Sequence, residues 1–291
     1  MGQLYSTSVL GFSVDLILWA FVIFSFLGVV VEMAFFLVME GALESRLGLL
    51  YLPLRPMYGV GGVACMLLLH GFLRRPLLIF LLGMLICTMV EYIAGVVMEK
   101  AFGTVFWDYS DKPLNLQGRV CLQYSVCWGL LALLPVYAAD RLLPGLVNAF
   151  GRQEVREAVL TGVMVLVLLS WVLTLAAFVR VRERLTVLRT QAGGETVPGV
   201  ATAWDRLFDR LVPDSVMINT FPQTNLVMDL IDLTGERRTS VRVPGYRPLS
   251  ARRHNSATRP EKRPGREVAV AGGARIPRRS GDEQSEDPLI A

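Results

Sequence analysis

Residues Leu16–Val38 read LILWAFVIFSFLGVVVEMAFFLV, and Glu32 is the one charged residue among these 23 positions. A helix rises about 1.5 Å per residue, so this stretch is long enough to cross the roughly 30 Å of hydrocarbon in a bilayer. No basic residue precedes it and no small-residue cleavage site follows it, which excludes a cleavable signal peptide. The stretch therefore predicts a transmembrane helix that stays in the protein.

Four further apolar runs follow along the chain. They are Met57–Leu73, Pro76–Met98, Val120–Ala139 and Ala158–Val179. Met57–Leu73 is the shortest and follows the apolar segment Leu49–Leu54, so we expect part of this approach to dip into the membrane without crossing it. Together the runs predict an all-α fold, a polytopic membrane bundle of about five transmembrane helices.

The overall composition excludes an ordinary cytosolic enzyme. Of the 291 residues, 53% are hydrophobic and 19% are charged, and the mean hydropathy is +0.47. Soluble domains are less apolar. After the last run no segment is long and apolar enough to span. We therefore predict a helix bundle in residues 1–182, a juxtamembrane segment in residues 183–235 and a disordered tail in residues 236–291.

Two short helices are expected in the juxtamembrane segment. The first lies in Ala201–Val212, where apolar residues at helical spacing share one face and charged residues the other: Trp204, Leu207, Phe208 and Leu211. An amphipathic helix of this kind lies on the membrane surface or packs against its own bundle, and the pattern leaves both open. The apolar patch Leu226–Leu233 predicts a second helix before Gly235.

Basic residues are concentrated in the tail. Residues 236–280 hold 13 Lys and Arg against three acids, and residues 281–291 hold four acids and no base. Pro, Gly, Ser and Arg dominate without a hydrophobic period, which is typical of disorder. Next to the inner leaflet, each basic residue would gain about 1 kcal/mol from anionic lipids, so we expect lipid contact rather than nucleic-acid binding. A plain solvated tail is the alternative.

Basic residues near the span ends predict the orientation of the chain, because Lys and Arg collect on the cytoplasmic side. Nine flank one side: Arg46, Arg55, Lys100, Lys112, Arg119, Arg180, Arg182, Arg184 and Arg189. Five flank the other: Arg74, Arg75, Arg141, Arg152 and Arg156. This bias predicts an N-terminus outside and a cytoplasmic C-terminus.

The sequence offers no catalytic or metal-binding pattern. Its four Cys lie in or beside apolar runs, with no pair at the two-residue spacing of a metal or redox motif, so we expect them to act as small hydrophobes. His70 and His254 have no ligand pattern around them. A nucleophile–base pair and a Gly-x-x-x-x-Gly-Lys-Ser/Thr phosphate loop are missing too. We predict a protein that is not an enzyme, has no cofactor or metal, and needs a separate ATPase for any ATP-driven role.

Acids inside the apolar runs are candidate functional residues. Glu32 lies in the first run and Glu91 in the third, with Glu99 eight residues further on. A carboxylate in hydrocarbon costs several kcal/mol unless it is paired, protonated or hydrated, so each should face the bundle interior. Because the first and third spans run in the same direction, their acids lead toward the same membrane face.

The loop after Glu99 is dense in polar and aromatic residues: Trp107, Asp108, Tyr109, Ser110, Asn115 and Arg119. Asp108 and Ser110 suit a capped turn, and Trp107 and Tyr109 suit the membrane interface. Arg119 is placed to meet Glu99 or Asp108. The acids and Arg119 form a polar core that either lines a pathway for a solute or ion or clamps the helices together. The sequence leaves both readings open.

A succession of short motifs runs through the first four apolar runs. They are Ser25-Phe26-Leu27-Gly28 with Glu32, Pro53 followed by Pro56-Met57-Tyr58-Gly59, Glu91-Tyr92 with Glu99, Trp107-Asp108-Tyr109-Ser110, and Asn115 with Gly118-Arg119-Val120-Cys121-Leu122. Over roughly residues 15–180 the chain resembles a bacterial family of small membrane proteins, the ABC-transporter type IV permeases. The resemblance is most specific in the third run and the loop after it. It implies a role in transport and names no substrate.

These observations predict a transport-related permease subunit of the bacterial inner membrane that carries a small solute or ion. The expected partners are the lipid bilayer, anionic lipids at the basic tail, a separate ATPase subunit and further copies of the chain. The alternative is a non-transporting membrane scaffold or regulator that presents the tail. A transporter should need Glu32 and Glu91, whereas a scaffold should need the tail.

Overall fold

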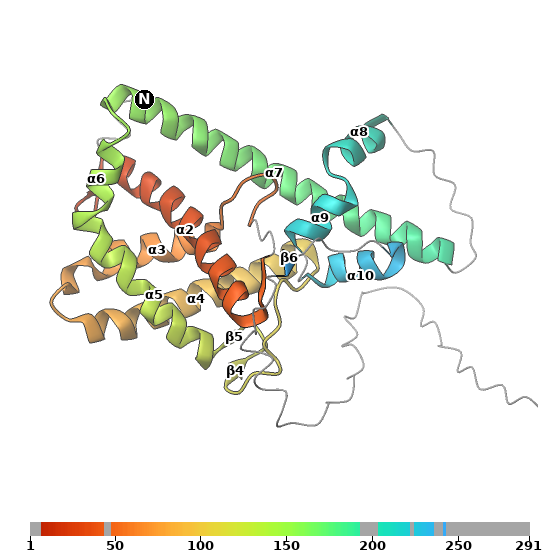
Figure 1. The fold of residues 1–291 in the computed structure, drawn as a ribbon, viewed down its shortest axis with the longest axis horizontal. Coiled ribbons are helices and arrows are strands. Elements are labelled where there is room, and N and C mark those ends of the chain that lie inside the picture. Colours follow the sequence, from red (N-terminus) through yellow and green to blue (C-terminus); the bar gives the residue numbers. More distant parts are fainter. Residues whose placement is uncertain (1–6, 44–47, 193–202, 222–223, 236–240, 243–291) are drawn as a thin grey trace, which may run out of the picture. The chain divides into compact units, whose positions relative to one another are not determined.

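The computed structural model describes residues 7–43, 48–192, 203–221, 224–235 and 241–242, and these are mostly helical (Figure 1). The longer helices are α2 (Val14–Glu40), α3 (Pro56–Leu69), α4 (Pro76–Phe102), α5 (Leu122–Arg141) and α7 (Gln153–Ala192). The shorter ones are η1 (His70–Phe72), α6 (Leu143–Asn148), α8 (Ala203–Leu211), α9 (Asp214–Thr220) and α10 (Asn225–Thr234).

Strands are confined to three short antiparallel pairs within the described residues. β1 (Ser8–Val9) pairs with β2 (Phe12–Ser13), β3 (Ala42–Leu43) with β6 (Val241–Arg242), and β4 (Asn115–Leu116) with β5 (Val120–Cys121). Apart from β6, the tail for which disorder and lipid contact are predicted lies outside the described residues.

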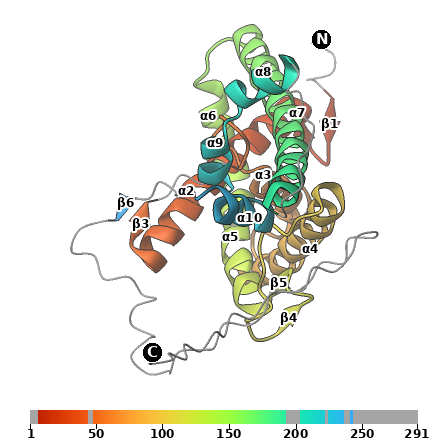
Figure 2. The same ribbon diagram turned by 90° about the vertical axis from the view of Figure 1, so that its right-hand side faces the viewer.

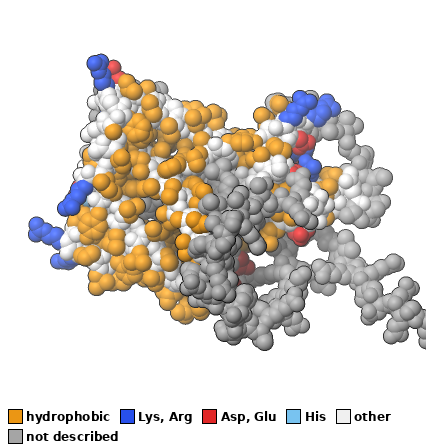
Figure 3. All heavy atoms as spheres, in the orientation of Figure 1, with side chains coloured by type: hydrophobic (Ala, Val, Ile, Leu, Met, Phe, Trp, Pro, Cys, Tyr) orange, Lys and Arg blue, Asp and Glu red, His pale blue; other side chains and the backbone are white. Residues whose placement is uncertain are grey.

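Four of the described helices are long and apolar enough to cross a membrane: α2, α4, α5 and α7. On the face shown in Figure 3, hydrophobic side chains cover most of the helix bundle, and Lys and Arg side chains stand at its margins. Large exposed apolar residues such as Leu77, Leu85 and Leu168 belong to these helices. In water such a surface would be unfavourable, whereas lipid chains solvate it. The prediction of an all-α, multi-pass membrane bundle is therefore confirmed.

The fifth apolar run forms a shorter helix than the others. α3 has 14 residues, about 21 Å of helix, and falls short of the hydrocarbon thickness. Its first end lies deep in the bundle, because the backbone N–H of Arg55 donates to the carbonyl oxygen of Ser25 in the middle of α2 (2.9 Å). Its other end lies beside the last turn of α5, where His70 Nε2 is 2.7 Å from Asp140 Oδ1. The chain therefore still passes from one end of the bundle to the other between α2 and α4.

The missing length is supplied by a re-entrant segment, Gly48–Arg55, which precedes α3. Leu50 is fully buried, and its N–H donates to Thr174 Oγ1 of α7 (3.2 Å), while Ser170 Oγ donates to its carbonyl oxygen (2.6 Å). Non-helical backbone is tolerated at membrane depth where protein groups satisfy its hydrogen bonds. The dip expected before the second run is thus stabilised by two hydroxyl groups of α7.

α7 is much longer than a single span. Its 40 residues extend about 60 Å, roughly twice the hydrocarbon thickness. α8, α9 and α10 pack along its C-terminal half (Figure 2). Ion pairs from α7 hold them there, the shortest being Arg180 with Asp209 (3.1 Å), Arg184 with Asp214 (3.1 Å) and Arg189 with Asp229 (2.6 Å).

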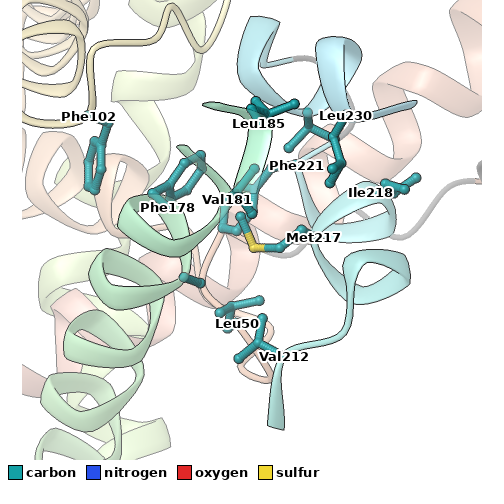
Figure 4. Close-up of a cluster of buried hydrophobic side chains, with 12 residues drawn as sticks. Leu50, Phe102, Phe178, Val181, Leu185, Val212, Met217, Ile218, Phe221 and Leu230 are labelled. Atoms are coloured by element: carbon teal, nitrogen blue, oxygen red, sulfur yellow. The ribbon is translucent and has the colours of Figure 1, made fainter. Parts of the chain in front are cut away.

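A hydrophobic core lies between these short helices and α7 (Figure 4). Phe178, Met217, Ile218 and Leu230 are almost completely buried in it, with Leu50 of the re-entrant segment. Phe208 of the amphipathic helix α8 packs against this core, whereas Leu207 and Leu211 of the same helix are about half exposed, so contact with the chain and contact with a membrane surface both fit. Both helices expected in the juxtamembrane segment are present, as α8 and α10.

Candidate functional site

A cavity of about 360 Å³ opens at the end of the bundle where α2 and α4 end and α5 begins. Its walls come from α2, the start of α3, α4, α5 and the loop between α4 and α5. Half of the lining residues are aromatic, and the charged ones are Glu32, Arg55, Glu91 and Asp108. We call it the Glu91 cavity. Its volume is in the range of small-molecule sites.

Glu91 is the most buried acid in this cavity. It lies in the middle of α4 and is 2% exposed. Tyr109 Oη donates a hydrogen bond to its Oε1 (3.2 Å), and Trp128 Nε1 donates one to its Oε2 (2.9 Å). Among the described residues, no Lys, Arg or His forms an ion pair with it. Two neutral donors thus hold a carboxylate that has no counterion of its own.

Tyr109 belongs to the loop that covers the cavity. Burial, together with the nearby carboxylate of Glu91, raises the pKa of Tyr109 well above its ordinary range. Its hydroxyl therefore keeps its proton at physiological pH and remains a donor to Glu91. Its ring also packs against Tyr124 of α5, with the centroids 4.7 Å apart.

Glu32 is paired with a residue that the sequence did not place in the polar core. Its Oε2 lies 2.5 Å from Nε of Arg55, and both side chains are about 15% exposed. Arg55 reaches Glu32 because the re-entrant segment brings the start of α3 to the middle of α2. From the sequence, Arg55 contributed only to the count of basic residues that predicts the orientation of the chain in the membrane.

Glu99 and Arg119 form a second, separate pair beside the cavity. Arg119 Nη2 donates to Glu99 Oε2, one of the two partners that the sequence predicted for Arg119. Glu99 is 44% exposed, so the pair contributes little to stability. Neither residue is part of the cavity wall. The predicted polar core is therefore divided between a cavity with Glu32, Glu91 and Asp108 and an outer clamp.

The loop between α4 and α5 is shaped by its own side chains. Asp108 Oδ1 accepts hydrogen bonds from the N–H (2.9 Å) and the hydroxyl (2.6 Å) of Ser110. Asn115 Nδ2 donates to the carbonyl oxygens of Ser110 and Lys112, and Trp107 Nε1 donates to that of Arg119 (2.7 Å). These bonds hold Trp107, Asp108 and Tyr109 in the cavity wall, whereas Ser110 and Asn115 support the turn.

A smaller apolar cavity of about 50 Å³ lies next to the first, on the side of the opposite end of the bundle. Five residues line both: Val31, Met57, Tyr58, Trp128 and Leu131. The rings of Tyr58 and Trp128 pack together between the two spaces, with their centroids 4.8 Å apart. Further along, the thiols of Cys65 and Cys87 are in contact, with 3.5 Å between their sulfurs. Within the described residues, no group of three or more His, Cys, Asp or Glu could hold a metal ion.

Most of the aromatic and apolar wall of the cavity was not predicted from the sequence, and neither was Arg55; Tyr58 and Trp128 are two examples from that wall. Tyr58 and Trp128 are aromatic residues inside apolar runs, where spacing does not distinguish a cavity wall from lipid contact. Arg55 could have been recognised from its position between Leu54 and Pro56, at the start of an apolar run. A buried Arg at such a position needs an acidic partner.

Comparison with known families gives one result. Residues 19–175, more than half of the chain, match the family described as "Putative ABC-transporter type IV". The match includes the whole of the Glu91 cavity and excludes α8, α9 and α10. No curated protein and no solved structure matches the chain.

Proposed function

The chain belongs to the ABC-transporter type IV family, and from this premise we propose that it is a permease subunit that carries a small solute or ion through its helix bundle. The single observation that carries the proposal is the Glu91 cavity: a buried carboxylate without an ion-pair partner in the described residues lines a space open to one end of the bundle. Ionisable residues inside membrane helices are costly, and they mark solute pathways more often than random positions.

The surroundings of the cavity support a pathway rather than a purely structural clamp. A short helix that begins inside the bundle after non-helical backbone is a recurrent device of transporters for forming a binding site near the midplane. α3 and the segment Gly48–Arg55 have this arrangement. The smaller cavity extends the route, and its wall includes Pro135, which interrupts the hydrogen-bond ladder of α5.

The energy source in this proposal is a separate ATPase subunit. The chain contains no phosphate-binding loop, and we propose that it is not itself an enzyme. The folded unit of α8, α9 and α10 on the extended α7 offers a surface for such a partner at the same end of the bundle as the Glu91 cavity, since α10 contacts the loop after α4 through Leu226 N–H to Thr104 Oγ1 (3.1 Å).

We further propose that this end faces the cytoplasm in the bacterial inner membrane, with the N-terminus outside. The excess of nine flanking basic residues over five motivates the orientation. A green fluorescent protein fused after Ala291 should fluoresce, and alkaline phosphatase fused at the same place should be inactive. An active phosphatase together with a dark fluorescent protein would reverse the orientation.

Substitution of Glu91 by Gln tests the pathway. The Gln oxygen can accept from Trp128, while its amide donates to the hydroxyl oxygen of Tyr109, so the variant should fold and melt close to the wild type. The full chain, purified with its co-purifying ATPase, is reconstituted in liposomes loaded with a cell extract. We expect ATP-dependent solute flux, followed by mass spectrometry, to fall at least about 10-fold in Glu91→Gln.

Asp140→Asn is the matched control, because Asp140 is an exposed acid at the other end of the bundle. It should leave flux unchanged. If Glu91→Gln transports as well as the wild type, the cavity is not the route. If no ATPase co-purifies and no flux is found, the chain is a scaffold, and removal of residues 236–291 should then abolish its cellular phenotype.

A further inference from the structure

We propose that the Glu91 cavity binds an organic cation of the quaternary-ammonium class. This inference rests on the proposed function, because it names the substrate class of the same cavity. It is carried by the combination of a buried carboxylate without a counterion and walls made of aromatic rings.

The charges of the cavity favour a cation. Its wall contains three acids, Glu32, Glu91 and Asp108, and one base, Arg55, which is held by Glu32. Asp108 accepts from Ser110, so part of its charge is satisfied within the loop. The remaining acid is Glu91, which is 2% exposed and has two neutral donors. A bound cation would stabilise the ionised form of Glu91 in this low-dielectric site, whereas an anion would be repelled by it.

The aromatic rings are arranged on both sides of Glu91. Trp128, which donates to one carboxylate oxygen, packs on Tyr58. Tyr109, which donates to the other, packs on Tyr124, and Phe35 meets Tyr124 edge-on with 6.1 Å between centroids. Each of these rings lines the cavity. Ring faces attract a cation within about 6 Å, and cages of such rings recognise methylated ammonium groups.

The same lining disfavours a bare metal ion. Mg²⁺ and Ca²⁺ prefer six or more oxygen ligands, and Zn²⁺ prefers a cluster of His, Cys or carboxylate groups. No cluster of that kind occurs in the described residues. A cation with an apolar coat, in contrast, is desolvated at little cost and fills a 360 Å³ space with ring contacts.

The test is a binding titration of the purified full-length protein in detergent. The probes are tetramethylammonium, choline and the neutral isostere of choline, 3,3-dimethylbutan-1-ol. Trp107 and Trp128 line the cavity, so quenching of Trp fluorescence reports occupancy, and the melting temperature provides a second readout. We expect both cations to bind and to raise the melting temperature, and the neutral alcohol to bind at least about 10-fold more weakly.

Two variants connect the binding to the proposed groups. Glu91→Gln should weaken choline binding by at least about 10-fold, and Tyr124→Leu by about 3- to 30-fold, while both unliganded proteins melt near the wild-type temperature. Phe150→Leu is the aromatic control, since Phe150 stacks on Trp19 away from the cavity. It should bind choline normally.

The outcomes separate this inference from the function on which it rests. Equal binding of choline and its neutral isostere, or no binding of either cation, overturns the cation site. If Glu91-dependent flux of another solute class is then found in the liposomes, the permease function stands without it. Selective cation binding that depends on Glu91, with no flux of any solute, supports the cation site and contradicts transport.

Discussion

Substitution of Arg55 by Gln should destabilise the folded protein by about 3–5 kcal/mol. Nε of Arg55 and Oε2 of Glu32 lie 2.5 Å apart and both side chains are about 15% exposed, so the substitution leaves the carboxylate of Glu32 without its guanidinium partner in a site largely shielded from bulk solvent. The free energy of unfolding, measured by titration with sodium dodecyl sulfate in mixed micelles, should show the loss. Because a less stable protein is unfolded for a larger part of the time, the yield of folded protein should fall as well.

The double variant Glu32→Gln with Arg55→Gln separates charge from packing. It removes both charges and leaves two amides that can hydrogen-bond, so most of the lost stability should return. Asp140→Asn breaks the exposed pair with His70 and should cost no more than about 1 kcal/mol. An Arg55→Gln protein as stable as the wild type would show that Glu32 and Arg55 do not meet.

Replacement of Gly59 by Ala should cost about 3 kcal/mol or more, because α2 and α3 are in direct backbone contact there. A Cβ on Gly59 would lie 2.2 Å from Ser25 Oγ and 2.7 Å from the carbonyl oxygen of Phe21. The carbonyl belongs to the α2 backbone and cannot move aside as a flexible side chain could. The helices would have to separate, which would also displace Arg55 and Tyr58 from the Glu91 cavity.

Gly162→Ala is the matched control for this prediction. Gly162 lies in α7, and a Cβ there would meet no atom within 4 Å. Ala favours a helix over Gly by up to about 1 kcal/mol, so this variant should be as stable as the wild type or more so. The melting temperatures of the two variants in one detergent provide the comparison. Equal melting of Gly59→Ala and Gly162→Ala would contradict the close contact between α2 and α3.

The transmembrane helices could be predicted from the sequence because hydropathy is a local property. Each run such as Leu16–Val38 must form its own backbone hydrogen bonds in lipid, so length and composition suffice to predict a helix. The end of α2 illustrates the limit. Gly41, with φ of 69°, ends that helix, and the next segment turns back into the bundle instead of crossing the surface. Hydropathy alone did not predict whether this segment enters the bundle. The hydroxyl groups of Ser170 and Thr174 on α7 hold it there through hydrogen bonds to Leu50.

The candidate site was predicted in part. Glu91 with Trp107, Asp108 and Tyr109 was recognised because a buried acid and a polar aromatic loop are unusual next to apolar runs, and all four line the cavity. Whether that acid serves a pathway or a clamp depends on its partner. Arg119 pairs with Glu99 on the outer side, while Glu91 is held by Tyr109 and Trp128, which are 18 and 37 residues away. Sequence spacing does not report such contacts.

The sequence by itself therefore determined the membrane helices, the change of composition after α7, and the few charged residues inside the bundle. These follow from the length, polarity and charge of each segment, because solvation by lipid or by water depends on the segment's own residues. The tertiary structure alone decided which acid received a counterion. The re-entrant segment brings Arg55 to Glu32 and none of the described bases to Glu91, and the packing of α5 on α4 puts the aromatic rings around that carboxylate. Both depend on contacts between distant segments, which no local pattern encodes.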